Sequence, residues 1–328
     1  MSNKTTQSYN GVALPITEVQ ALKDVERLLQ DNGYLNAGEA IPVLCVKDTF
    51  ARSEHNISFY AENNTVIALS VRDCALTALP ASLGQLTNLQ QLDVTDNQLS
   101  SFPESLGNLL QLKKIYADGN QITSLPASLG NLRQLEEIHA DRNQLTAIPE
   151  SICQLPNLKI LHLYSNKLAA VPASLCQLTY LNDVSLGKNQ LIALPESFWQ
   201  LTNLHILNIA ENRLSALSEN IGNLTHLHTL DVGHNALTSL PESLGKLTQL
   251  TFFLYLSNNQ LTSLPNSLAH LSNLKYLNIT DNQLTALPHI FGNLTNLIEL
   301  RLYNNQLTTL PESLGKLTNL QELHLKNN

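Results

Sequence analysis

The stretch LQQLDVTDNQLSSFPESLGNLLQ, residues 89–111, sets the pattern of most of this chain. Its frame of leucines, asparagine, proline and glycine returns at steps of 23 residues, except that the copy from Leu250 has one extra residue. A divergent copy comes first, and the last one stops at Asn328. Such a period predicts a solenoid, because one copy can bury its apolar side chains only against its neighbours. The copies begin at Val66, Leu89, Leu112, Leu135, Leu158, Leu181, Leu204, Leu227, Leu250, Leu274, Leu297 and Leu320.

Each copy divides into two halves with different spacings. In the first half, alternation around Asp93 predicts a strand that buries Leu92 and Val94 and leaves Asp93 on an open face. The asparagine that follows, Asn97 in this copy, is expected to bond the backbone of its own turn and of the adjacent copy. In the second half, apolar residues at helical spacing follow a proline, which predicts a short helical or 3₁₀ turn that the glycine limits.

This pattern, L-x-x-L-x-L-x-x-N-x-L-x-x-L-P-x-x-L-G-x-L-x-x, resembles the leucine-rich repeat. It is most similar to the intracellular Ras-group type and to bacterial and archaeal relatives, including the arms of Roco proteins. The resemblance implies an α/β fold: a right-handed solenoid, or horseshoe, with a parallel β-sheet on the concave side and short helical or 3₁₀ turns on the convex side. We expect residues 66–328 to form it, with eleven full repeats and a partial twelfth.

Residues 1–65 do not follow the repeat. Thr17 and Gln20 read as a capping box that starts a helix, and Gly33 as its stop. Residues 57–69 read as two strands joined around 62–64. We interpret the segment as a helix plus hairpin that caps the first repeat, and a separate functional domain is the alternative. The last repeat has no polar cap, which favours a fragment of a longer protein or an end that self-associates.

Composition limits the classes of function. The net charge of −8 argues against nucleic-acid or anionic-membrane partners, and no stretch approaches the roughly 18 apolar residues that span a bilayer. Residues 1–10 are polar and do not resemble a secretory signal. Four cysteines (Cys45, Cys74, Cys153 and Cys176) are too few for a disulfide framework, so we expect a cytoplasmic protein. A domain cut from an exported precursor is the alternative.

The cysteines also have individual interpretations. Cys74 replaces the repeat asparagine and is expected to be a buried core residue rather than a nucleophile. Cys153 and Cys176 lie one repeat apart in the glycine position, where free thiols are expected in preference to a disulfide. Trp199 occupies the same position in the next repeat. The three form an apolar stripe that either packs into the convex layer or offers a contact site.

Motifs of catalysis are missing from the sequence. Gly245-Lys-Leu-Thr and Gly315-Lys-Leu-Thr imitate only the end of a phosphate-binding loop, and they belong to the repeat. His139 and His162, like His205 and His228, stand one repeat apart and could share a metal, but a histidine-rich binding surface is the preferred interpretation. We therefore expect a protein that is not an enzyme, with no metal and no cofactor.

Binding residues should occupy the variable strand positions between the fixed leucines. Tyrosine and arginine, which are favoured as binding anchors, gather there and at the flanking positions in two clusters. The plainer interpretation is that aromatic residues are common on exposed strands. The extra residue of the Leu250 copy, near the second cluster, either bulges the strand and re-aims Phe253 or is harmless. The first cluster is Tyr116, His139, His162 and Tyr164, and the second is Phe253, Tyr255, Tyr276, Arg301 and Tyr303.

These observations favour a scaffold that binds a folded protein on its concave face, and we expect a role in intracellular signalling. The resemblance to Ras-group repeats suggests a small GTPase or a signalling enzyme as partner. One alternative is the sensing arm of a larger signalling enzyme, such as a GTPase, whose catalytic domain is absent. Another is a cell-surface adhesin or carbohydrate binder, because tyrosine-rich faces also stack on sugars.

Overall fold

A computed structural model describes residues 6–44 and 56–328, so Cys45 lies outside the described residues. The chain divides into two compact units, residues 1–167 and 168–328, and each is described by itself below. We call them the N-terminal unit and the C-terminal unit. No helix among the described residues combines the length and the apolar character that a membrane span requires.

The N-terminal unit begins with an antiparallel pair of strands and a helix, and continues into a second sheet of seven strands. In that sheet β3 pairs with β4 in parallel, β4 and β5 form an antiparallel hairpin, and β5 to β9 are parallel. The elements are β1 (Thr6–Tyr9), β2 (Val12–Pro15), α1 (Ile16–Asp31), β3 (Val43–Leu44), β4 (Ile57–Glu62), β5 (Thr65–Val71), β6 (Gln91–Asp93), β7 (Lys114–Tyr116), β8 (Glu137–His139) and β9 (Ile160–His162).

The C-terminal unit contains seven strands, each paired in parallel with the next. Its strands are β10 (Asp183–Ser185), β11 (Ile206–Asn208), β12 (Thr229–Asp231), β13 (Phe253–Tyr255), β14 (Tyr276–Asn278), β15 (Glu299–Arg301) and β16 (Glu322–His324). In each unit one three-residue strand per coil keeps the alternation predicted from the sequence: in most coils the middle residue is buried and its two neighbours are half-buried. The predicted parallel sheet of a leucine-rich repeat solenoid is therefore confirmed.

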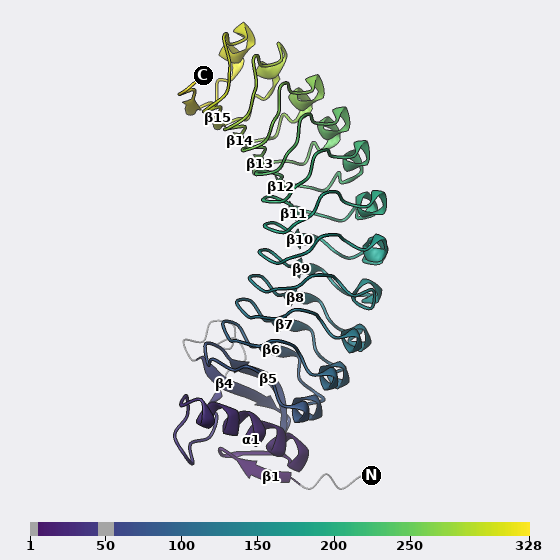
Figure 1. Cartoon of the computed structure of the whole chain (residues 1–328), viewed down its shortest axis with the longest axis vertical. Helices are drawn as coiled ribbons and strands as arrows, with labels where there is room; N and C mark the ends of the chain where they lie inside the picture. Colours follow the sequence, from purple (N-terminus) through teal and green to yellow (C-terminus); the bar gives the residue numbers. More distant parts are fainter. Residues whose placement is uncertain (1–5, 45–55) are drawn as a thin grey trace. The chain divides into compact units, whose positions relative to one another are not determined.

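The second half of each coil forms a 3₁₀ turn, and in both units these turns lie on the side of the coils away from the strands (Figure 1). Before eight of the turns stands a proline with φ between −71° and −64° and ψ between 140° and 147°. The proline thus precedes the turn instead of opening it. The turns are η2 (Ala81–Gln85), η3 (Glu104–Asn108), η4 (Ala127–Asn131), η5 (Ile152–Gln154), η6 (Ala173–Gln177), η7 (Glu196–Gln200), η8 (Glu219–Asn223), η9 (Glu242–Lys246), η10 (Asn266–His270), η11 (Phe291–Asn293) and η12 (Glu312–Lys316).

The repeat asparagines form the predicted ladder between coils. The Oδ1 atom of Asn97 accepts from the backbone N–H groups of Cys74 and Leu76 at 3.1 and 3.0 Å. Its Nδ2 atom donates to the carbonyls of Val71 and Val94 at 2.7 and 2.9 Å. Buried backbone groups in two coils are thereby satisfied by one side chain. Similar bonds recur at Asn120, Asn143, Asn166, Asn212, Asn235, Asn259, Asn282, Asn305 and Asn328.

The repeat glycines have a role that differs from the predicted one. Gly107 and Gly245 lie inside their 3₁₀ turns and do not end them. A Cβ atom at Gly245 would stand 2.3 Å from the carbonyl oxygen of Ser267 in the next coil, and one at Gly107 would stand 2.5 Å from the Cβ atom of Ser128. At these two positions glycine lets adjacent 3₁₀ turns approach closely. The expectation that it limits the turn is wrong.

In the convex stripe, Cys153 and Trp199 are buried, and Cys176 is half-buried. Cys74 is fully buried, and burial, followed by the charge of Asp73, raises the pKa of its thiol to about 12, which confirms a core residue. Cys153 and Cys176 form no disulfide with each other, as predicted. Trp199 is only 2% exposed, so packing, and not surface contact, is the correct interpretation of this position.

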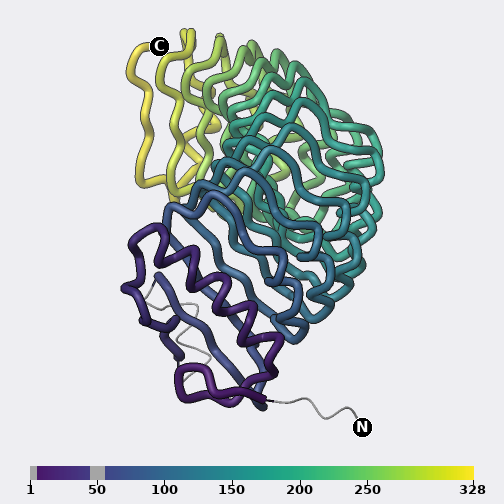
Figure 2. The backbone as a smooth tube through the Cα atoms, turned by 60° about the horizontal axis from the view of Figure 1, so that its bottom comes forward, coloured from purple at the N-terminus to yellow at the C-terminus, as the bar shows by residue number. Residues whose placement is uncertain are grey.

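Helix α1 lies alongside the first coils of the N-terminal unit (Figure 2). Its Glu18 side chain is buried and accepts from the N–H of Val66 at 2.8 Å, and Asp24 accepts from the hydroxyl of Ser82 at 2.6 Å. The predicted capping box is wrong: Pro15 precedes the helix, no side chain caps it, and Gln20 donates to Asp24 instead. The proposed domain boundary between residues 65 and 66 stays a prediction.

The extra residue of the Leu250 coil leaves the strand in register. Phe253 of β13 pairs with Thr229 on one side and with Tyr276 on the other, in the frame that the other parallel strands follow. The additional residue is accommodated before the strand, where the side chain of Phe252 is 47% exposed. The harmless interpretation of the longer coil is therefore correct, and the strand does not bulge.

Candidate functional site

The outward side chains of the strands form a surface that we call the sheet face. In the N-terminal unit the sheet face holds the first predicted cluster. The rings of Tyr116 and His139 stack with centroids 4.8 Å apart and planes at 28°, and His162 meets His139 edge to face, also at 4.8 Å. Tyr164 lies half-buried two residues after His162, and its backbone N–H donates to Asp141 at 2.6 Å. Three rings from three adjacent strands are thus in contact.

Glu137 connects this cluster to a charge network that the sequence did not reveal. Its carboxylate accepts from the Tyr116 hydroxyl at 3.1 Å, stands 3.4 Å from His139 Nε2, and pairs with Lys114 Nζ at 2.7 Å. The hydrogen bond with His139 is the largest cause that lowers the pKa of Glu137 to about 2, helped by Lys114 and Tyr116 and opposed by burial. The signal that could have found Glu137 is its place opposite Lys114 in the strand register.

Aspartates form the second part of the network. Asp118 Oδ1 accepts from the N–H of Asp141 at 2.7 Å, and burial and the charge of Asp118 raise the pKa of Asp141. Burial also raises the pKa of Asp93, whose carboxylate lies 3.7 Å from Arg72. Next to Asp93, a hollow of about 200 Å³ has Tyr116 as a wall. The sheet face of this unit therefore combines aromatic rings with partly desolvated carboxylates.

The second predicted cluster surrounds a hollow in the C-terminal unit. Phe253 stacks on Tyr255 at 5.4 Å with planes at 9°, and on Tyr276 at 5.0 Å with planes at 28°. These rings line a hollow of about 290 Å³ together with Glu299 and Arg301. Its remaining lining residues are Leu277 and Asn278.

Arg301 and Tyr303 complete the second cluster in different ways. The guanidinium Nε of Arg301 pairs with Glu299, and half of the arginine side chain is exposed. Tyr303 does not line the hollow; it contacts His324, with centroids 5.1 Å apart and its hydroxyl 2.6 Å from His324 Nδ1. The structure therefore brings four of the five predicted residues to one hollow and places the fifth beside it.

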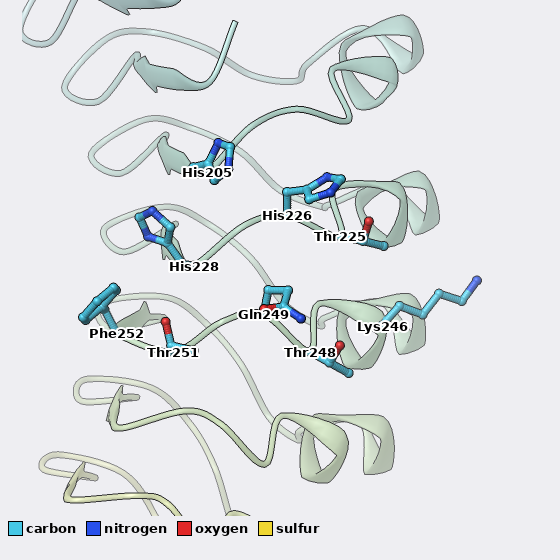
Figure 3. A pocket seen from close by; sticks show the side chains of 9 residues that line it. All are labelled: His205, Thr225, His226, His228, Lys246, Thr248, Gln249, Thr251 and Phe252. Atoms are coloured by element: carbon cyan, nitrogen blue, oxygen red, sulfur yellow. The ribbon is translucent and has the colours of Figure 1, made fainter. Parts of the chain in front are cut away.

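A further hollow, of about 500 Å³, lies on the flank of the C-terminal unit between the strands and the 3₁₀ turns (Figure 3). His205 faces His228 at 5.8 Å and His226 at 6.1 Å between ring centroids, and Phe252 meets His228 edge to face at 5.5 Å. Burial and the charge of His205 lower the pKa of His228. The sequence predicted that His205 and His228 lie close together, but it did not predict that His226 and Phe252 join them.

The groups on the sheet face suit recognition. Aromatic faces in fixed stacks offer apolar area at little cost in side-chain entropy, because their rotamers are already restricted. Neighbouring carboxylates and the guanidinium of Arg301 add directional polar contacts of both signs. Such a surface can bind an extended chain or the edge of a folded protein.

Known structures place this arrangement in context. A leucine-rich repeat protein of Leptospira interrogans, LIC12759, is 34% identical over 77% of this chain and 76% of its own, with a TM-score of 0.59. A TDR receptor is 30% identical over 80% of this chain, with a TM-score of 0.73. The Arabidopsis receptor kinase HAESA, in complex with the peptide hormone IDA and the co-receptor SERK1, is 26% identical over 93%, with a TM-score of 0.70. The chain spans 47% of the TDR receptor and 50% of HAESA.

Sequence families give a consistent result. The family described as a leucine-rich repeat region matches residues 39–146. The family described as leucine rich repeat matches residues 156–214, 225–284 and 279–328. No curated protein matches the chain. Because these matches cover most of the sequence, and because the coils carry the strand, the asparagine ladder and the 3₁₀ turn in each unit, the chain belongs to the leucine-rich repeat family.

Proposed function

We propose that this protein is a non-catalytic binding module that holds a protein partner on the sheet face of its C-terminal unit. The observation that carries the proposal is the hollow of about 290 Å³ with Phe253, Tyr255 and Tyr276 as its walls and Arg301 at its rim. Protein interfaces concentrate their binding energy in a few aromatic and arginine side chains that lie in such pockets.

The three rings support binding because they are only half-buried in the free chain. A partner that covers them removes apolar area from water, which contributes roughly 25 cal/mol per Å². The stacking between Phe253 and its two neighbours fixes the ring positions, so few rotamers are lost on binding. The HAESA complex, whose protein ligands are a peptide hormone and a co-receptor, supports a protein as the bound class.

The N-terminal unit adds a second contact surface to the proposal. Its carboxylates surround the rings of Tyr116 and His139, and the pKa values of Asp93 and Asp141 are raised by burial. A cationic side chain of a partner would stabilise these partly desolvated carboxylates. We therefore propose that the partner presents basic residues to this surface.

The cellular setting is also a proposal. The resemblance to Ras-group repeats and Roco arms supports a cytoplasmic protein whose partner is a small GTPase or another signalling enzyme. Cys74, Cys153 and Cys176 form no disulfide with one another, which agrees with a reducing compartment.

The test is affinity capture from a lysate of the source cells, followed by a measurement of affinity with the purified partner. The variant carries Phe253→Ala, Tyr255→Ala and Tyr276→Ala, and the matched control carries Tyr180→Ala and Ile192→Ala, two exposed apolar residues of the same unit. We expect the first variant to lose the partner, with at least a 10-fold loss for Tyr276→Ala alone, and the control to retain it. Both need an unchanged thermal unfolding midpoint.

The proposal fails if the triple variant and the wild type recover the same protein with equal affinity. If the wild type captures no protein but binds to an array of glycans, the result would instead favour a carbohydrate binder. In that case the same three substitutions should abolish binding to the glycan, because the sugar would stack on these three rings.

A further inference from the structure

Two glutamates and one histidine converge on the last two strands of the C-terminal unit, and one of them, Glu299, also lines the aromatic hollow. Glu299 of β15 and Glu322 of β16 are direct cross-strand partners, and His324 follows two residues later on the same face. One ligand atom from each of the three side chains lies within 4.8 Å of the others. We infer that Glu299, Glu322 and His324 form a binding site for a divalent transition-metal ion such as Zn²⁺.

The two distances between the imidazole nitrogen and the carboxylate oxygens fit one ion. His324 Nε2 stands 3.1 Å from a carboxylate oxygen of Glu322 and 3.5 Å from one of Glu299. In tetrahedral zinc sites the bonds to imidazole nitrogen and carboxylate oxygen are about 2.0–2.2 Å long, so the ligand atoms stand roughly 3.3–3.6 Å apart. Both distances from the imidazole are therefore close to the required ones.

Tyr303 holds the histidine in the orientation that a metal requires. The hydroxyl of Tyr303 lies 2.6 Å from His324 Nδ1, so Nε2 is the ring nitrogen that faces the two carboxylates. Metal-binding histidines commonly bond a second group through the nitrogen that does not bind the metal, because that bond fixes the tautomer and the ring. Tyr303 lies outside the three ligands and would act as a positioning residue.

The charge of the site also calls for a cation. Like charges directly opposite each other on adjacent strands destabilise a sheet, and Glu299 and Glu322 occupy such positions. Arg301, through its Nε, already contacts the same oxygen of Glu299 that faces His324. Its guanidinium is thus a competitor for one ligand atom, and the ion would displace it from that atom.

The ligand types select the class of ion. Imidazole nitrogen with two carboxylates suits zinc and its neighbours in the first transition series, whereas Ca²⁺ and Mg²⁺ prefer all-oxygen sites with more ligands. Three protein ligands leave at least one position of a tetrahedral ion for water. We expect Zn²⁺ to bind without dependence on millimolar Ca²⁺ or Mg²⁺.

Direct titration of the whole chain with Zn²⁺ tests the site. We expect the His324→Gln variant to bind one Zn²⁺ ion fewer per chain than the wild type. The matched control His289→Gln should bind as many ions at this site as the wild type. The comparison of variants is needed because His205, His226 and His228 can bind Zn²⁺ as a separate background. Tyr303→Phe keeps all three ligands and should lower the affinity for this Zn²⁺ ion 10- to 100-fold. Arg301→Ala should raise that affinity.

Two further readouts separate the metal site from a simple ion-pair network. Co²⁺ should give visible absorption bands of a tetrahedral ion in the wild type that His324→Gln lacks. Zn²⁺ should slow amide hydrogen exchange in β15 and β16 of the wild type, because the ion ties the two strands together. The inference is overturned if wild type and His324→Gln bind the same number of ions with equal affinity. An Arg301→Ala variant whose Zn²⁺ affinity falls would also contradict it.

Discussion

At the scale of single residues, Glu137 shows how a strand position acquires its chemistry. The carboxylate has one partner on its own strand, His139, and two on the adjacent strand, Lys114 and Tyr116. Its side chain is only 17% exposed, so these contacts are poorly screened by water. The ionised form is the one that the three partners stabilise, and it is therefore linked to the stability of the fold.

This linkage predicts how stability depends on pH. The pKa of Glu137 is lowered from 4.5 in the reference state to about 2. Its contribution to the free energy of unfolding is then present above about pH 4.5 and is lost as the pH falls towards 2; it is on the order of 3 kcal/mol. Urea unfolding of Glu137→Gln should show lower stability than wild type at pH 7 and a smaller difference at pH 2.

Glu104→Gln provides the comparison for this prediction, because Glu104 is exposed on the 3₁₀ side of the same unit. It should leave the free energy of unfolding within about 0.5 kcal/mol at both pH values. A constant difference between Glu137→Gln and wild type from pH 7 to pH 2 would contradict the assigned role.

The sequence predicted which residues face outwards, and it could not predict how they pair. Tyr116, His139, Tyr255 and Tyr276 were found because their position within the repeat fixes the face on which they lie. Glu299 was missed because its importance depends on the rotamers of neighbours on other strands. Repeat position says nothing about those rotamers, so the networks around the clusters needed the structure.

At the scale of elements, the 3₁₀ turns are held by close contact between adjacent coils. The repeat glycine is small enough for the serine backbone of the next turn to come within van der Waals distance. This contact occurs between elements that are distant in sequence, and for that reason the glycine was misread as a local stop signal. The proline lies just before the turn in extended backbone, with the φ that its own ring fixes.

A pair of substitutions tests the role of the glycine. Gly245→Ala places a Cβ atom 2.3 Å from Ser267 O, whereas a Cβ atom at the equivalent Gly315 has nothing within 4 Å. We expect Gly245→Ala to lower the free energy of unfolding by about 1–3 kcal/mol through overpacking. Gly315→Ala should be neutral or stabilising by a few tenths, through a less flexible unfolded chain.

Chemical denaturation of the two variants, with wild type beside them, provides the measurement. Equal effects at the two positions would show that glycine acts through local backbone conformation. Only the close approach of adjacent turns explains a large difference between two alanines in the same repeat position.

At the scale of the whole molecule, stability is distributed over many similar coils. Most coils bury their leucines and their ladder asparagine against adjacent coils of the same unit, so cohesion is a sum of neighbour contacts. A destabilising substitution should consequently lower the local stability of adjacent coils first. Globular domains with one shared core behave differently, because their unfolding is usually all-or-none.

Hydrogen exchange after a core substitution would reveal this distribution. Leu230 is fully buried in the middle strand position of β12, and Leu230→Ala should cost about 2–5 kcal/mol. Amides of β11 to β13 should lose protection by the largest factor, and those of α1 and β4 should keep theirs. A uniform loss of protection across all described elements would show a single cooperative core instead.

The longer coil at Thr251 and Phe252 separates two properties that most folds combine. Its additional residue enters before β13, and the register of three neighbouring strands is unchanged. The new side chain stands on the flank, beside His228, with Lys275 Nζ 5.9 Å from the centre of the Phe252 ring. In this architecture coil length and strand register vary independently. Evolution or protein engineering can thus add side chains to the flank by inserting single residues there, while the sheet face stays unchanged.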